Sequence, residues 1–203
     1  VFNERIDKHE VNMLRDESML ITFLHPAAPE NHDIVKRLRD KNVTALTMDG
    51  SPRISCAQPM DALSSMSTVA GYKSVIMAAN QLQAFIPMIG TAIGTIKPAR
   101  FLIVGTGVVG LQAIATAKRL GGVVTAVDIR KDACVEAESL GAKIVKFDIP
   151  QELAVGQGGY ARALENEWLE IEQRVIAPHL EDADVVILSA LVPGEIAPIL
   201  LTE

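Results

Sequence analysis

The first fifty residues alternate between short apolar runs and a helical pattern. Met19–Leu24 is a short apolar run typical of a buried strand, and Val43–Met48 is predicted to be another strand. Asp33–Lys41 has apolar residues along one helical face, and a weaker helical pattern covers Glu4–Leu14. Because a helix between two strands favours a parallel sheet, we expect residues 1–51 to form half of a small α/β domain.

A long helical segment follows, from Asp61 to about Phe85. Asp61 is a suitable N-cap, and small residues such as Gly71 inside the segment permit close packing. The stretch from Ser74 to Ile96 has no charged residue and is long enough for a membrane span. Polar residues and a proline interrupt it, however, so we interpret it as a buried helix followed by a loop.

Four strand–helix units then predict an α/β fold with a doubly wound, Rossmann-type parallel sheet. The expected strands are Phe101–Val104, Val123–Val127, Ile144–Phe147 and Asp184–Ala190. The expected helices are Val108–Leu120, Asp132–Leu140, which Gly141 ends, and Ala161–Ile176. A complete sheet of this kind has about six strands, so we expect the natural domain to continue beyond residue 203.

The chain therefore divides into three segments by prediction. Residues 1–60 form part of a smaller, flavodoxin-like α/β domain, and residues 61–98 form a linking helix and loop. Residues 99–203 form the Rossmann domain, truncated at its C-terminal end. The first residue is not methionine, so we expect a fragment or a processed form.

Composition narrows the function classes. The chain has 203 residues, 49% of them apolar and 22% charged, which is typical of a soluble globular protein. The net charge of −6 argues against nucleic acid as the main partner. Two cysteines, Cys56 and Cys134, are too few for a disulfide framework and favour a reducing compartment. The N-terminus has no signal-peptide pattern, and the histidines lack metal-ligand spacing, so we expect no metal.

The segment Val104–Gly110 carries the pattern G-x-G-x-x-G between a strand and a helix. In this context Gly105 permits a tight turn, Gly107 lets the backbone approach a pyrophosphate, and Gly110 lets the helix pack on the strand. The N-terminus of the helix offers free N–H groups to the phosphates. The pattern predicts a dinucleotide site.

Asp128 ends the next strand, 18 residues after Gly110. There it can accept hydrogen bonds from the adenosine ribose, and it would repel a 2′-phosphate, which favours NAD(H) over NADP(H). The neighbouring Arg130 leaves this choice open, because arginine here can accommodate a 2′-phosphate. A second glycine cluster, residues 156–160, is either a lid over the bound dinucleotide or a surface loop.

A distinctive segment spans Pro52–Ser67 (PRISCAQPMDALSSMS) and continues with Ala70–Lys73. It resembles the NAD(H)-binding component of proton-translocating nicotinamide nucleotide transhydrogenases, which is similar to alanine dehydrogenase. The resemblance continues through further motifs in the same order: Gly105–Gly110, Val127–Arg130, Gln157–Ala161 and Ala190–Gly194.

The resemblance implies two α/β domains with NAD(H) in the cleft between them. A hydride passes directly between NAD(H) and NADP(H) held on a partner domain, and a transmembrane domain couples this transfer to proton translocation. It further implies a homodimer without membrane insertion by this chain. The soluble domain is expected at the cytoplasmic face of a bacterial inner membrane or the matrix face of a mitochondrial-type inner membrane.

The resemblance also implies site residues, matched motif to motif. Arg53, Gln58, Asp61 and Ser64 are expected at the nicotinamide end, as the catalytic set. The expected NAD(H)-binding positions are Arg53, Ile54, Ser55, Gly105, Gly107, Val108, Gly110, Asp128, Ile129, Arg130, Gly159, Glu172 and Leu191.

The residue types alone leave alternatives open. Hydride transfer between two nicotinamides needs no general acid or base, only polar groups that hold the rings in contact. Arg53 could equally form a surface ion pair, Gln58 could be a solvated loop residue, and Asp61 could be only a helix cap. An amino-acid dehydrogenase of the alanine dehydrogenase type would need proton transfer, for which His25 is the candidate. The third hypothesis is a non-catalytic NAD(H)-binding module or an inactive fragment of the enzyme.

Overall fold

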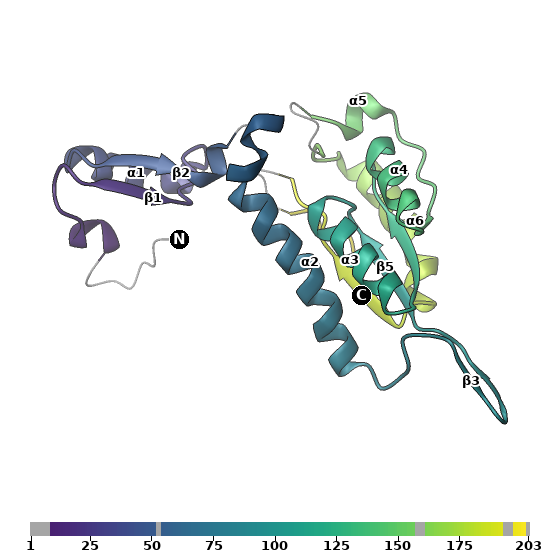
Figure 1. Ribbon diagram of the computed structural model, residues 1–203. Helices are drawn as coiled ribbons and strands as arrows, with labels where there is room; N and C mark the ends of the chain where they lie inside the picture. Colours follow the sequence, from purple (N-terminus) through teal and green to yellow (C-terminus); the bar gives the residue numbers. More distant parts are fainter. Residues whose placement is uncertain (1–8, 52–53, 157–160, 193–196, 202–203) are drawn as a thin grey trace. The chain divides into compact units, whose positions relative to one another are not determined.

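The computed structural model describes residues 9–51, 54–156, 161–192 and 197–201 (Figure 1). The chain divides into two compact units, Val1–Ser65 and Met66–Glu203.

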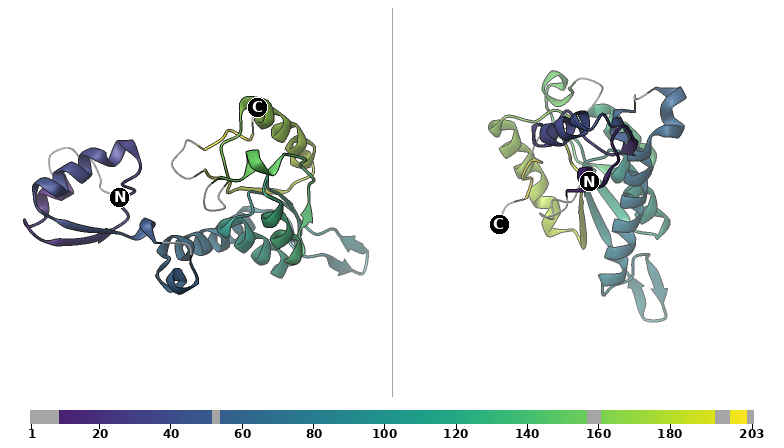
Figure 2. Two further views of the ribbon diagram at one scale, coloured as in Figure 1. Left: turned by 90° about the horizontal axis from the view of Figure 1, so that it is seen from above. Right: turned by 90° about the vertical axis from the view of Figure 1, so that its left-hand side faces the viewer.

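Unit 1 is built around two parallel strands, β1 (Met19–Thr22) and β2 (Thr44–Thr47), in the register Ile21↔Leu46. Helix α1 (His32–Asp40) connects them and packs along the pair (Figure 2). The core joins the 3-10 helix η1 (Glu10–Met13) to these elements through Val11, Leu24, Leu38 and Val43. The predicted strand–helix–strand unit is therefore confirmed.

Two details of unit 1 differ from the prediction. Strand β1, which was predicted to be buried, is exposed through Met19 and Ile21 on the face opposite α1, as is Leu46 of β2. In the predicted helix Glu4–Leu14, the described residues form only the four-residue 3-10 helix η1. Residues 1–8 lie outside the described portion of the chain.

Helix α2 (Ala62–Gln81) begins after the 3-10 helix η4 (Ser55–Met60). It ends four residues earlier than predicted, and only Gly71 and Val75 are buried within it, so the prediction of a buried helix is wrong. A Cβ on Gly71 would overlap the carbonyl oxygen of Val109 in helix α3 (Val108–Arg119), which explains the small residue at this contact. Among the described helices, none combines the length and hydropathy that a membrane crossing requires.

A β-hairpin of β3 (Ile89–Thr91) and β4 (Gly94–Ile96) follows where a loop was predicted. The hairpin extends away from the parallel sheet of unit 2 (Figure 1). Its turn residue Ile93 is 99% exposed.

Unit 2 contains a four-stranded sheet of order β7-β6-β5-β8, parallel throughout. Its strands are β5 (Arg100–Val104), β6 (Val123–Val127), β7 (Lys143–Ile144) and β8 (Val185–Leu188). The connections contain α3, α4 (Lys131–Ser139), α5 (Gln151–Ala154) and α6 (Asn166–Glu181). The predicted α/β fold with a parallel sheet is confirmed.

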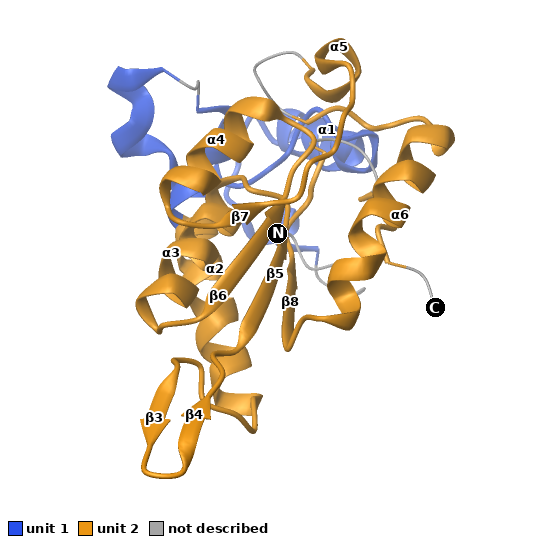
Figure 3. Cartoon of the chain, turned by 90° about the vertical axis from the view of Figure 1, so that its right-hand side faces the viewer, with its two compact units in different colours: residues 1–65 blue, residues 66–203 orange. Residues whose placement is uncertain are grey.

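Alternating residues of β5 separate two apolar clusters on the two faces of the sheet. Phe101 and Ile103 pack with α2, α3 and α4, whereas Leu102 and Val104 pack with Ile176 of α6. Figure 3 shows α3 and α4 on one side of the sheet and α6 on the other. All four residues are at most 1% exposed, as a strand covered on both faces requires.

The third strand and the last helix depart from the predicted bounds. β7 ends at Ile144, and Phe147, predicted within the strand, lies edge-on to Trp168 of α6, with ring centroids 6.5 Å apart. Helix α6 begins at Asn166 rather than Ala161, because Ala161 forms a β-bridge with Val155. Helix α5 was not predicted.

Candidate functional site

The turn after β5 requires glycine at Gly105. Its φ of +89° is unfavourable for other residues, and a Cβ would lie 2.6 Å from the backbone nitrogen of Ala190. The Gly105 N–H donates to the Val127 carbonyl at 2.8 Å, and the Ser189 hydroxyl donates to the Gly105 carbonyl at 2.7 Å. The carboxyl ends of β5, β6 and β8 therefore fix this turn.

The other two glycines of the pattern differ in what surrounds them. A Cβ on Gly110 would overlap the Gly105 carbonyl oxygen, so glycine is needed there for α3 to pack against the turn. A Cβ on Gly107 would meet only the Arg130 Nη2, at 4.0 Å, and the backbone of Gly107 is extended. The surrounding fold therefore does not require glycine at position 107, and the space beside it is open.

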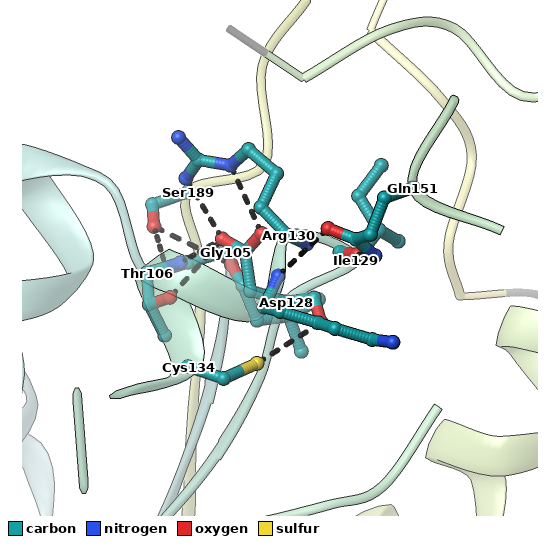
Figure 4. Close-up of polar contacts among 10 residues, drawn as sticks. Gly105, Thr106, Asp128, Ile129, Arg130, Cys134, Gln151 and Ser189 are labelled. Atoms are coloured by element: carbon teal, nitrogen blue, oxygen red, sulfur yellow. Dashed lines mark hydrogen bonds and ion pairs between the residues drawn. The ribbon is translucent and has the colours of Figure 1, made fainter. Parts of the chain in front are cut away.

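Asp128 is the centre of the polar network beside this turn (Figure 4). It is 8% exposed, and its Oδ2 accepts hydrogen bonds from the Thr106 backbone N–H at 2.7 Å and the Thr106 hydroxyl at 3.1 Å. Its Oδ1 accepts from the Arg130 backbone N–H at 2.8 Å. The carboxylate thus joins the glycine-rich turn after β5 to the turn after β6.

The Arg130 guanidinium binds the same carboxylate with two hydrogen bonds. Nε donates to Oδ1 and Nη2 to Oδ2 of Asp128, each at 3.0 Å. Burial would lower the pKa of Arg130, but the hydrogen bonds and the charge of Asp128 raise it overall. Arg130 is therefore held as a cation on Asp128.

Two further residues hold the same turn, and the sequence analysis did not identify them. The Cys134 thiol donates to the Asp128 carbonyl at 3.3 Å, and burial, with the nearby charge of Asp128, raises its pKa. The Gln151 amide contacts the backbone of Ile129 and Lys131. Thr106 and Ser189 were also missed, although their contacts connect the turns.

Glu172 of α6 is a buried carboxyl group close enough to Asp128 to sense its charge. It is 6% exposed. Burial and, second, the negative charge of Asp128 raise the pKa of Glu172 to about 7. Leu191, another predicted position, follows β8 and is exposed.

The expected nicotinamide residues lie in unit 1, whereas the glycine-rich turn lies in unit 2. Asp61 caps α2: its Oδ1 accepts from the Ser64 N–H at 2.9 Å and its Oδ2 from the Ser64 hydroxyl at 2.6 Å. Gln58, Ile54 and Ser55 are exposed in or beside η4. Arg53 and Gly159 lie outside the described residues.

His25 follows β1 and pairs with Asp49. Its Nδ1 lies 3.3 Å from an Asp49 carboxylate oxygen, and its φ of +45° is uncommon for a residue other than glycine. Burial would raise the pKa of Asp49, but hydrogen bonds from Thr47, His25 and Leu24 lower it overall. The His25 imidazole therefore lies beside the Asp49 carboxylate, which stays ionised.

The chain is similar to known proteins along almost its whole length. Residues 3–70 match the family model "Alanine dehydrogenase/PNT, N-terminal domain", and residues 74–203 match "Alanine dehydrogenase/PNT, C-terminal domain". NAD(P) transhydrogenase subunit alpha of Cereibacter sphaeroides is 41% identical over 97% of this chain and 38% of its own length. Alanine dehydrogenase of Staphylococcus epidermidis is 29% identical over 96% of this chain and 46% of its own.

A solved structure is similar as well. The crystal structure of transhydrogenase from Sinorhizobium meliloti matches with a TM-score of 0.75 and 36% identity, over 93% of this chain and 49% of that chain. The chain thus spans half or less of the length of each of these relatives. The resemblance inferred from the sequence motifs is confirmed, and the chain belongs to the alanine dehydrogenase/PNT family.

Proposed function

We propose that unit 2 is a dinucleotide-binding domain of the Rossmann type that takes NAD(H) at the carboxyl ends of β5 and β6. The network of Gly105, Gly107, Gly110 and Asp128 is the observation that carries this proposal. The strand order β7-β6-β5-β8 is that of the first strands of such a fold, with β5 as its first strand. The division at residues 60 and 98 into two domains and a linking segment belongs to the same proposal.

The residues present fit the components of the dinucleotide. The pyrophosphate fits at the N-terminus of α3, which begins at Val108, next to the unobstructed space beside Gly107. Asp128 suits the adenosine ribose, with Ile129 and Arg130 in the same turn. Glu172, Leu191 and Gly159 complete the proposed binding set, while Ile54 and Ser55 belong to the nicotinamide end.

The pair of Asp128 and Arg130 favours NAD(H) over NADP(H). A ribose hydroxyl can donate to the Asp128 carboxylate in place of one guanidinium hydrogen bond. A 2′-phosphate would instead meet a buried negative charge, while the arginine that could bind it is held by that charge.

We further propose that the chain is the NAD(H)-binding component of a proton-translocating transhydrogenase. When bound, NADH supplies a hydride to NADP⁺ on a partner domain. Arg53, Gln58, Asp61 and Ser64 orient the nicotinamide, and no residue has to move a proton at the reacting carbon. A transmembrane domain couples the transfer to proton translocation, with this component at the cytoplasmic or matrix face of the membrane.

The test is a hydride-exchange assay between NADH and an NADP⁺ analogue. The chain alone holds one glycine-rich dinucleotide motif, so we expect transfer only after a purified NADP(H)-binding component is added. Exchange that is absent in the mixture, although NADH binds, would contradict the transhydrogenase assignment and leave a non-catalytic NAD(H)-binding module.

The hairpin β3–β4 supports a homodimer within this proposal. Met88, Ile93 and Ile96 are exposed apolar side chains on or beside an isolated two-stranded hairpin, a structure that is marginal without further packing. Light scattering of the wild type and of Ile93→Ser tests the homodimer. The wild type should be a dimer, and Ile93→Ser should dissociate more readily. A monomeric wild type would contradict the homodimer.

The pair of His25 and Asp49 favours a second candidate, an alanine-dehydrogenase-like reaction. An imidazole oriented through Nδ1 by a carboxylate is suited to general acid–base catalysis. NADH oxidation with pyruvate and ammonia by this protein, lost in His25→Ala, would support this candidate over the transhydrogenase.

A further inference from the structure

Gln151 connects two segments at the candidate adenosine end of the site. Its Nε2 donates to the Ile129 carbonyl at 3.2 Å and to the Ile149 carbonyl at 3.4 Å. Its Oε1 accepts from the Lys131 backbone N–H at 3.1 Å. One side-chain amide thus pairs with the carbonyl of Ile129 and with the N–H of Lys131, the residues on either side of Arg130.

This contact also caps α4. The first N–H groups of a helix lack partners within the helix, and the N-cap residue Arg130 makes no side-chain cap. The Gln151 oxygen accepts the N–H of Lys131, the first residue of α4. A residue 20 positions later therefore replaces the missing local cap.

The turn of residues 128–130 is consequently held from two sides (Figure 4). Asp128 binds the Arg130 backbone N–H and guanidinium, and Gln151 binds the flanking backbone groups of Ile129 and Lys131. Asp128 and Gln151 together determine the position of the Arg130 Cα. That position in turn determines whether the Arg130 guanidinium can reach Asp128.

Gln151 is itself well anchored. Ile149, two residues before it, is 2% exposed, and Ala154 at the end of α5 is fully buried. Gln151 therefore lies between two buried apolar residues of unit 2.

We propose that Gln151 is a positioning residue that fixes the 128–130 turn and thereby sets the preference for an unphosphorylated adenosine ribose. The proposal rests on the proposed NAD(H) function. Without Gln151 the turn loses two backbone hydrogen bonds, Arg130 is released from Asp128, and its guanidinium can reach a 2′-phosphate.

The experiment compares wild type, Gln151→Ala, Gln151→Glu and Glu152→Ala by titration calorimetry with NADH, ADP-ribose and NADPH. Gln151→Glu keeps the acceptor for Lys131 at similar size but removes the donor to Ile129. Glu152 is the neighbouring, exposed residue of α5 and serves as the matched control. Melting temperatures are measured on the same four proteins.

We expect both Gln151 variants to bind NADH and ADP-ribose about tenfold more weakly, by the same factor for each, since the loss is at the adenosine end. NADPH affinity should fall less, so that the ratio of the two dissociation constants narrows, while Glu152→Ala keeps the wild-type ratio. If the Gln151 variants melt at a lower temperature but keep the wild-type ratio of NADH and NADPH dissociation constants, the proposal is overturned and Gln151 has only a structural role. Wild type that binds no NADH would instead overturn the proposed function itself.

Discussion

Arg130 and Asp128 form a two-point ion pair, with both nitrogen–oxygen distances at 3.0 Å and the side chain of Asp128 only 5% exposed. The pair bears on the choice between NAD(H) and NADP(H), which the sequence left open. An arginine near the acidic residue could bind a 2′-phosphate, but the guanidinium of Arg130 is already held by the Asp128 carboxylate. We therefore expect the turn to favour a ribose without a 2′-phosphate.

Removing the charge at position 128 should weaken this discrimination. Asp128→Asn keeps an acceptor for Thr106 but releases Arg130 and no longer repels a 2′-phosphate. We expect the preference for NADH over NADPH to narrow by roughly 1–3 kcal/mol, measured from dissociation constants. Asp132→Asn, an exposed acidic residue of α4, is the control and should keep the preference. An unchanged preference in Asp128→Asn would mean that other residues select the ribose.

Gly107 and Gly110 should respond differently to alanine. Gly107→Ala places its methyl group on the open side of the turn, so folding should persist while NADH affinity falls about tenfold, or about 1.4 kcal/mol. Gly110→Ala forces α3 away from Gly105 and should lower the melting temperature as well. Calorimetric binding and thermal unfolding of both variants check this. Normal NADH binding by Gly107→Ala would argue against pyrophosphate contact there.

Glu172 should make stability depend on pH. Its pKa is about 7 in the folded protein, against 4.5 ordinarily, so between these values the folded state holds a proton that the unfolded chain releases. The free energy of unfolding therefore falls as the pH rises from 4.5 to 7. The full loss is about 3 kcal/mol, and it is reached above about pH 7.

Urea unfolding of Glu172→Gln at about pH 5 and about pH 8, on either side of the raised pKa, tests this. The variant should resemble the wild type at the lower pH and be more stable at the higher pH, because the buried charge is gone. Glu170→Gln, an exposed residue of the same helix, should follow the wild type at both values. A wild type and a Glu172→Gln variant with the same pH dependence would contradict the raised pKa.

For the residues expected at the nicotinamide end, a role in hydride transfer can be measured separately from a role in stability. Gln58 is exposed, so Gln58→Ala should keep the melting temperature and bind NADH within about tenfold of wild type. Its hydride-transfer rate in a complex reconstituted with the NADP(H)-binding component should fall about ten- to a hundredfold, because small displacements of reacting atoms are costly.

Asp61 needs two substitutions, because it caps α2. Asp61→Ala should cost about 1 kcal/mol of stability, whereas Asp61→Asn preserves a good cap and removes only the charge. If Asp61 orients the nicotinamide, both variants transfer hydride more slowly. Normal transfer by folded Asp61→Asn would leave the carboxylate only its role as a cap.

The sequence predicted the elements of unit 2 whose structure depends on local pattern. The apolar run of β5, the turn at Gly105 and the helix after Gly107 follow from neighbouring residues, and their bounds agree to within a residue. The hairpin β3–β4 was missed because its turn residues Ala92 and Ile93 lack the Asn-Gly or Asp-Gly signal.

Tertiary contacts account for the other differences. Gln151 contacts backbone groups about twenty residues away, and nothing in its neighbourhood along the chain indicates this. Whether Arg130 is free or paired depends on side-chain geometry rather than on spacing. Phe147 fits a strand by residue type, but its contact with Trp168 takes it away from the sheet.

We propose above all that this chain binds NAD(H) through the turn that Asp128 and Arg130 form. Titration calorimetry of the unmodified protein with NADH and with NADPH tests it most directly. We expect NADH to bind at least about tenfold more tightly than NADPH, a difference of about 1.4 kcal/mol or more. Equal or tighter binding of NADPH, or no binding of NADH, would contradict the account.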